Sequence, residues 1–193
     1  MKAILIIVLL TFALCVDNLE GGWEKRSIYE NSIEIDEVFR QAYKEYSKTN
    51  SAELDDLLRL TIYTQVVSGT NYKLCFIDLK ADYRTIHEYV FYKPLAVNNN
   101  GLNEYLLQEH KQYDVSNEII TSNDPKYTIV ENEFIKKLKK TNEKFNYISY
   151  IYLAENEETS FYMISACTDG NEHQYIFCQE KKTEEFYIFN RIN

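Results

Sequence analysis

The chain runs twice through the same order of patterns, an amphipathic helical stretch followed by several strand-like segments. In the first pass the helical stripe covers about 34–48, where apolar side chains recur every three or four residues. Strict alternation follows, with Leu58, Leu60 and Ile62 on one side and polar residues between them. The second pass has its stripe at 130–138. Each pass therefore predicts an α+β unit, with one helix packed on a four- to five-stranded antiparallel sheet.

The strand-like segments divide between two units. No Pro- or Gly-rich linker separates the passes, and the boundary falls near Asp114–Val115. We expect a first unit at 16–114 and a second at 115–193, each long enough, at roughly 80–95 residues, for a modest core. After the first alternating strand, further strands are expected at about 72–76, 86–93 and 102–112, and then at about 145–153, 160–167, 174–181 and 185–192.

The amino end has the pattern of a secretory leader. Lys2 precedes an apolar run, and Ala13 and Cys15 are small residues at the spacing that places a cleavage site after Cys15. The alternative is a membrane anchor, but the run is shorter than the roughly 20 residues that a bilayer span needs. No later segment is apolar enough to cross a bilayer. We expect residues 1–15 to be a signal peptide and the mature protein to be secreted, extracellular and without a membrane segment.

Composition narrows the classes of function. The chain has 21 Lys and Arg against 30 Asp and Glu, a net charge of −9, which argues against broad binding of nucleic acids and favours a soluble monomer. Its 15% of aromatic residues disfavours a disordered chain. The 3 His show no metal-ligand spacing, and there is no Gly-rich phosphate loop or nucleophile elbow. We therefore expect a non-enzyme without metal or cofactor.

Three cysteines remain once the leader is removed: Cys75, Cys167 and Cys178. Cys167 and Cys178 flank a turn-like stretch, so a hairpin there would place them across from each other, and an oxidising compartment favours a disulfide between them. Connectivity does not follow from sequence alone. Cys75 lies in a strand pattern and is expected to be a buried small hydrophobe.

One hairpin turn carries the main functional signal. It reads Gln65-Val66-Val67-Ser68-Gly69, between the first two strands of the first unit. Two valines offer apolar contact, and a glycine lets the backbone bend and approach a partner closely. The alternative is an ordinary turn with a pair of strand-end valines. Position favours recognition, because the turn follows a helix and a long strand and lies downstream of Gly21-Gly22.

The stretch from about Gly21 to Asp114 resembles a cystatin, the inhibitor family of papain-like cysteine peptidases. The resemblance implies two tandem cystatin-like units, of which the second is degenerate because its corresponding turn, 154–158, is acidic and lacks glycine. Three elements carry the resemblance: Gly21 or Gly22, the Q-x-V-x-G signature formed by Gln65, Val66, Val67, Ser68 and Gly69, and Pro94-Leu95 at the second hairpin. Pro94-Leu95 is similar to the sequence at this place in the stefin branch of the family, whereas a secretory leader is unusual for stefins.

What the resemblance implies is a reversible, tight-binding inhibitor of cathepsin-like peptidases. The amino-terminal segment and both hairpins would plug the active-site cleft without reaction, at a low ordering cost because the hairpins are preformed. Two alternatives stay open: a non-inhibitory secreted binding protein on the same scaffold, and a latexin-like tandem-cystatin inhibitor of a metallocarboxypeptidase.

A second site is suggested at the end of the first helix. Thr49-Asn50-Ser51 resembles the loop through which some cystatins inhibit legumain, a peptidase specific for Asn. The alternative is that Asn50 is a polar residue capping the helix end.

Overall fold

The computed structural model describes residues 22–27, 32–95, 104–115 and 120–192. The predicted leader at 1–15 and Gly21 lie outside these residues. The chain divides into two compact units: one contains residues up to Tyr83 and His87–Gln112, and the other contains Arg84–Ile86 and Tyr113–Asn193. No helix among the described residues is long and apolar enough to span a bilayer.

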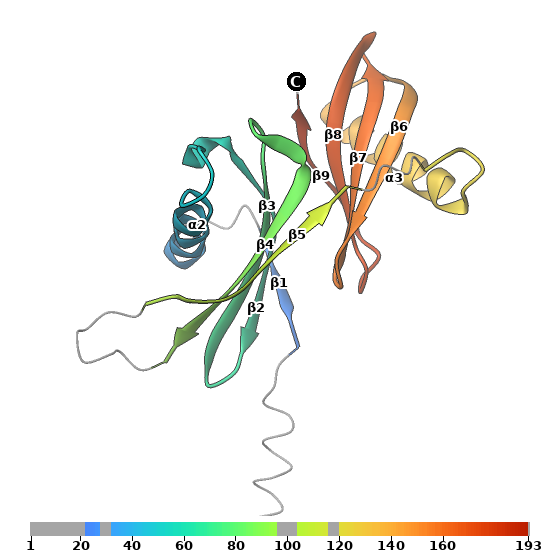
Figure 1. Cartoon of the computed structure of the whole chain (residues 1–193). Helices are drawn as coiled ribbons and strands as arrows, with labels where there is room; N and C mark the ends of the chain where they lie inside the picture. Colours follow the sequence, from blue (N-terminus) through green and yellow to red (C-terminus); the bar gives the residue numbers. More distant parts are fainter. Residues whose placement is uncertain (1–21, 28–31, 96–103, 116–119, 193) are drawn as a thin grey trace, which may run out of the picture. The chain divides into compact units, whose positions relative to one another are not determined.

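The first sheet has five strands in the order β1-β2-β3-β4-β5 (Figure 1). β1 pairs antiparallel with β2, and β2 pairs antiparallel with β3, so that the turn at 67–68 closes a long hairpin. The strands are β1 (Glu24–Arg26), β2 (Leu57–Val66), β3 (Gly69–Asp78), β4 (Asp82–Pro94) and β5 (Leu106–Asp114).

Helix α2 (Ile33–Tyr46) precedes β2, with a short 3-10 helix, η1 (Leu54–Asp56), between them. The Ser32 side chain caps the start of α2 by accepting a hydrogen bond from the backbone N–H of Ile35 at 3.4 Å. The predicted apolar stripe is confirmed. Its buried side chains share one cluster with side chains of β2, β3 and β4: Ile35, Val38, Phe39, Ala42 and Tyr46.

The second sheet has the order β6-β7-β8-β9 and is antiparallel throughout. Helix α3 (Pro125–Thr141) begins with Pro125 in its first turn, and the Asp124 carboxylate caps it by accepting from the backbone N–H of Lys126 at 2.8 Å. Its buried residues Val130, Phe134 and Leu138 belong to a cluster with side chains of the second sheet. The strands are β6 (Phe145–Glu155), β7 (Thr159–Thr168), β8 (Asn171–Glu180) and β9 (Phe186–Ile192).

The predicted α+β class is wrong. The structure is mostly antiparallel sheet, 52% strand and 23% helix, with two helices and two sheets among the described residues. The predicted plan of one helix packed on one sheet in each unit is not shown either, because the residues of β4 and β5 of the first sheet are divided between the two units. The sequence pattern predicted where the helices and strands lie, but it underestimated the length of the strands. β4, for example, runs for 13 residues, well beyond the 86–93 expected from alternation.

Strand β2 also departs from the predicted alternation of apolar and polar faces. Its central residues are buried on both faces, with Leu60, Thr61, Ile62 and Tyr63 each at most 2% exposed. The pairing with β3 shifts register between Arg59 and Thr61, and such a bulge interrupts strict alternation.

The predicted Cys167–Cys178 disulfide is wrong. Both cysteines are buried and neither forms a disulfide, although they lie on the neighbouring strands β7 and β8. Cys167 pairs in register with Glu172, whereas Cys178 pairs with Phe161. Six residues of β7 therefore separate the two positions, about 20 Å at the usual rise per residue, and a disulfide needs Cα atoms within roughly 7 Å. Cys75 is buried and forms no disulfide either, and burial together with the neighbouring Glu88 carboxylate raises the pKa of its thiol.

Candidate functional site

The candidate site is the tip of the β2–β3 hairpin and the chain segments beside it. Val66 is 65% exposed, and Ser68 is exposed as well. The tip is held closed because the backbone N–H of Val67 donates to the carbonyl of Gly69 at 3.0 Å. Just below it, the Asn71 side-chain amide donates to the Gln65 side-chain oxygen at 3.1 Å across the two strands. The tip is thus a rigid projection with an apolar side chain at its end.

Gly69 joins this tip to the end of β4. A Cβ atom at Gly69 would lie 2.4 Å from the carbonyl oxygen of Lys93 and 2.6 Å from the ring of Tyr92. The Tyr92 hydroxyl also donates to the carbonyl of Ser68 at 3.3 Å. Gly69 does not have a positive φ, so its missing side chain serves close approach to the protein's own strand β4 and not an unusual turn conformation.

This contact brings Pro94 and Leu95 beside the hairpin tip. They follow Lys93 directly, at the end of β4, and Leu95 is 75% exposed. Val66 and Leu95 are therefore two exposed aliphatic side chains on neighbouring projections of one unit. The remainder of the second hairpin, residues 96–103, lies outside the described residues.

Residues 22–23 lead into β1 at the same end of the sheet as the tip. Glu24 of β1 pairs antiparallel with Thr64 of β2, two positions before Val66, and Figure 1 shows the start of β1 beside the β2–β3 end of the sheet. Gly22 is exposed, and a Cβ there would meet nothing within 4 Å. Trp23 is half-buried, with its ring centroid 4.5 Å from the ammonium of Lys73 on β3. Gly22, the hairpin tip and the end of β4 therefore lie at one end of the first sheet.

A polar network that sequence reasoning missed holds the end of β4 to helix α2. The Lys93 ammonium lies 3.6 Å from the Glu34 carboxylate and donates to the Tyr105 hydroxyl at 3.1 Å. The Tyr105 hydroxyl donates to Glu37 at 3.2 Å, and the Tyr72 hydroxyl donates to Glu34. Burial and these carboxylates raise the pKa of both tyrosines, which stay neutral donors. No local pattern signals this network, because its members come from four separate segments.

Asn50 lies at the carboxyl end of the helical segment. Its side-chain amide donates to the carbonyl of Tyr46 and to the Thr49 hydroxyl, each at 3.0 Å. Its backbone N–H also donates to the Tyr46 carbonyl at 3.2 Å. These contacts satisfy the Tyr46 carbonyl, one of those that a helix end leaves open, so a role in capping the helix is enough to explain Asn50. The hypothesis of an asparaginyl-peptidase site stays a prediction.

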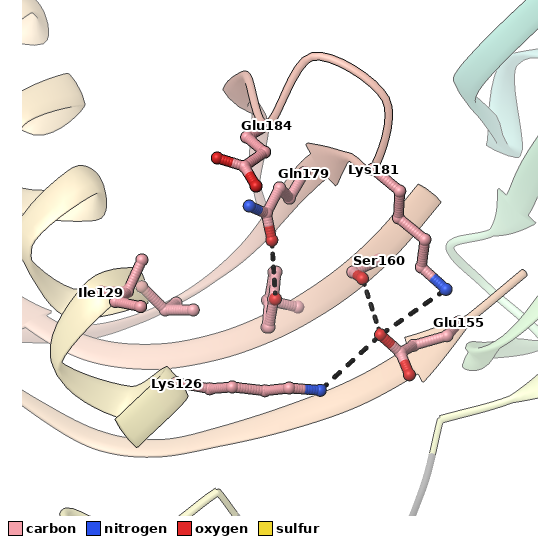
Figure 2. A pocket seen from close by; sticks show the side chains of 9 residues that line it. Lys126, Ile129, Glu155, Ser160, Gln179, Lys181 and Glu184 are labelled. Atoms are coloured by element: carbon pink, nitrogen blue, oxygen red, sulfur yellow. Dashed lines mark hydrogen bonds and ion pairs between the residues drawn. The ribbon is translucent and has the colours of Figure 1, made fainter. Parts of the chain in front are cut away.

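The corresponding turn of the second unit is a closed, acidic turn. The Asn156 side-chain oxygen accepts from the backbone N–H groups of Glu158 and Thr159 at 3.0 and 2.7 Å, and Asn156 is only 6% exposed. Next to it lies a pocket of about 250 Å³. Figure 2 shows three groups converging there on the Glu155 carboxylate: the Ser160 hydroxyl at 2.7 Å, and the ammonium groups of Lys181 and Lys126 at 3.7 and 3.9 Å.

These contacts determine the charge of the Glu155 carboxylate in that pocket. The Ser160 hydrogen bond and the two lysines lower the pKa of Glu155, so the carboxylate stays charged and already has its partners. It is a poor general acid. A larger groove of about 560 Å³ runs between α3 and β9 and has lysines and glutamates on its walls. One of these lysines, Lys136, is paired with Glu133 at 3.3 Å, which favours a solvated helix face over an anion site.

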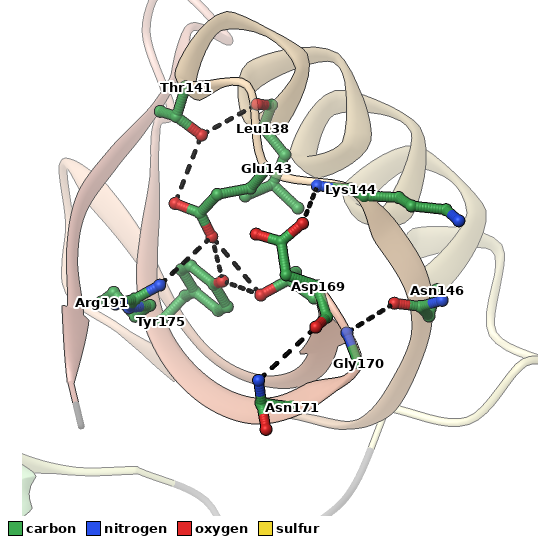
Figure 3. Close-up of polar contacts among 11 residues, drawn as sticks. Leu138, Thr141, Glu143, Lys144, Asn146, Asp169, Gly170, Asn171, Tyr175 and Arg191 are labelled. Atoms are coloured by element: carbon green, nitrogen blue, oxygen red, sulfur yellow. Dashed lines mark hydrogen bonds and ion pairs between the residues drawn. The ribbon is translucent and has the colours of Figure 1, made fainter.

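A second polar cluster holds turns of the second unit together (Figure 3). The Glu143 carboxylate accepts from the Tyr175 hydroxyl at 2.5 Å and lies 3.9 Å from the Arg191 guanidinium. Burial and Glu143 raise the pKa of Tyr175 to about 12. Asp169 and Gly170 have positive φ, as a tight two-residue hairpin turn requires. We interpret this cluster as structural.

No group of three or more His, Cys, Asp or Glu side chains in the described part of the chain is placed to hold a metal ion. Comparisons with known proteins found no family model that matches this chain and no curated protein that matches it.

Proposed function

We propose that this protein is a secreted, reversible inhibitor of papain-like cysteine peptidases, as its resemblance to cystatins implies. The inhibitory surface is the end of the first sheet, where the β2–β3 tip, Pro94-Leu95 and the Gly22 segment lie together. The observation that carries the proposal is the close contact of Gly69 with β4, which holds exposed Val66 beside exposed Leu95.

The geometry supports this function for a physical reason. A peptidase cleft is concave, and a projection that fills it gains affinity from buried apolar area only if little conformational freedom is lost on binding. Hydrogen bonds across the hairpin and from Tyr92 to Ser68 pre-order the tip before any partner arrives. In the proposed inhibition the tip occupies the cleft sterically and forms no covalent bond, as the resemblance to cystatins implies.

Titration of active papain with the mature chain tests the proposal. We expect stoichiometric, reversible loss of peptidase activity, with the inhibitor recovered uncleaved. Val66→Glu places a charge at the tip without disturbing the core and should weaken inhibition at least about tenfold, as for a residue near the centre of an interface. Ile129→Glu is the matched control, because Ile129 is a similarly exposed aliphatic residue, 56% exposed, on α3 of the other unit.

Deletion of residues 16–22 tests the amino-terminal segment in the same assay. Weaker inhibition with an unchanged maximum is expected, because the two projections remain. The proposal fails if the parent chain does not inhibit papain at micromolar concentration, or if Val66→Glu inhibits as well as Ile129→Glu does.

The proposal is confined to the first unit. The closed Glu155–Thr159 turn carries acidic groups in place of an apolar tip, and it has no glycine to allow close packing. The second unit should therefore not inhibit papain, and it should not make up for the inhibition that Val66→Glu loses in the first unit.

A further inference from the structure

Strand β5 is an unusually open edge of the first sheet. It is the last strand in the order β1-β2-β3-β4-β5, so one side of it has no neighbouring strand among the described residues. Eight of its nine residues are exposed. Leu106 and Leu107, which point to opposite faces of the strand, are 47% and 42% exposed. Edge strands of this length offer backbone N–H and C=O groups to another strand unless something prevents pairing.

The charges on β5 are arranged symmetrically about one residue. Glu109 and Lys111 lie two positions apart on the same face, with their charged groups 3.0 Å apart. His110 stands between them, on the opposite face, where its ring stacks on Tyr89 of β4 at 4.1 Å. His110 is also the midpoint of the strand, which runs from Leu106 to Asp114.

We infer that β5 is a self-association surface, on which a second copy of this chain adds its own β5 as an antiparallel strand centred on His110. A two-fold axis perpendicular to the sheet places each residue opposite the one at the same distance on the other side of the axis. With the axis at His110, Glu109 of each copy faces Lys111 of the other, and Gln108 faces Gln112. All nine residues of each strand overlap.

Other registers of the same symmetry are less favourable. An axis at Glu109 places that carboxylate opposite itself, and an axis at Lys111 places two ammonium groups together. Like charges directly opposite each other on paired strands are destabilising, whereas opposite charges contribute favourably. Moving the axis further removes the Glu–Lys pairs and leaves part of each strand unpaired. The His110-centred register is thus selected by charge complementarity and by length.

This arrangement differs from the monomer that net charge alone leads us to expect. The whole-chain charge of −9 repels a second copy at long range, but this repulsion is screened within about 8 Å at physiological salt. The cross-strand pairs act at contact distance, where screening is weakest. The inference does not rest on peptidase inhibition, since it uses a different strand edge.

Sedimentation equilibrium of the mature chain, from micromolar to millimolar concentration at physiological salt, tests the inference. We expect a reversible dimer. Lys111→Glu turns both Glu–Lys pairs into Glu–Glu pairs and should weaken dimerisation at least about tenfold. Glu109→Lys should do the same through Lys–Lys pairs, and the double exchange Glu109→Lys with Lys111→Glu should restore the parent affinity.

Lys139→Glu is the control for net charge. It makes the same change in charge as Lys111→Glu at an exposed position on α3, and it should leave the dimer intact. Circular dichroism checks that each variant is folded. If either Lys111→Glu or Glu109→Lys does not fold, the other single variant still tests the charge pairs. A chain that stays monomeric throughout, or a dimer that Lys111→Glu and Lys139→Glu weaken equally, or one that the double exchange does not restore, overturns the inference.

Discussion

Replacing Gly69 with alanine should damage both the fold and the proposed inhibitory surface. The new Cβ would lie 2.4 Å from the carbonyl oxygen of Lys93, where ordinary contact begins at 3.4 Å. The end of β4 must therefore move by about 1 Å, or the tip must move away from it, and packed proteins resist such shifts. Overpacking of this kind costs about 1–3 kcal/mol of unfolding free energy.

Urea denaturation followed by tryptophan fluorescence measures this cost. The chain has 1 Trp, and Trp23 packs against Lys73 of β3, so its signal reports on the first unit. Gly22→Ala is the matched control, because a Cβ there meets nothing within 4 Å. Its unfolding free energy should stay within about 0.5 kcal/mol of the parent.

A double variant separates the two atoms that crowd Gly69. The nearest is the backbone oxygen of Lys93, and the ring of Tyr92 comes next at 2.6 Å. Because backbone cannot be trimmed, Gly69→Ala with Tyr92→Ala should not recover the lost stability. Papain inhibition by Gly69→Ala should weaken at least about tenfold, a change of 1.4 kcal/mol, since Val66 and Leu95 no longer keep their spacing. A Gly69→Ala protein as stable as Gly22→Ala, or recovery in the double variant, would refute this reasoning.

Three further predictions concern other parts of the molecule. Native mature protein should resist alkylation by iodoacetamide, and unfolding without a reductant should expose three thiols, because Cys75, Cys167 and Cys178 are buried and form no disulfide. Mass spectrometry counts the alkylated thiols, and a single one would mean that a disulfide is present. Lys93→Met should lower the unfolding free energy by about 1 kcal/mol, with Lys93→Arg nearer the parent, because the ammonium joins β4 to α2. The pKa of Glu155 is lowered from 4.5 in the folded protein, so the ionised carboxylate stabilises the fold fully above pH 4.5 and loses this effect as pH falls through the lower folded pKa. Glu155→Gln should therefore flatten the acid side of a plot of melting temperature against pH. An unchanged slope would contradict the role given to Ser160, Lys126 and Lys181.

Several elements could be predicted from sequence because their causes are local. Asp124 and Pro125 start α3 through a side-chain cap and a fixed φ, which depend only on neighbouring residues. The apolar stripes of both helices became buried, since their spacing of three and four residues follows from helix geometry alone. The hairpin at Gln65–Gly69 likewise formed where strand alternation stopped.

The apolar faces of the two helices and the place of the β2–β3 hairpin tip follow from local patterns in the amino-acid sequence. Three other features arise from packing: Cys167 and Cys178 lie six register positions apart, Gly69 packs against β4, and Lys93 reaches α2. Strand register and the packing of separate segments depend on contacts between residues far apart in the chain. Periodicity shows that a side chain will be buried or exposed, but it carries no information about which distant atom that side chain will meet.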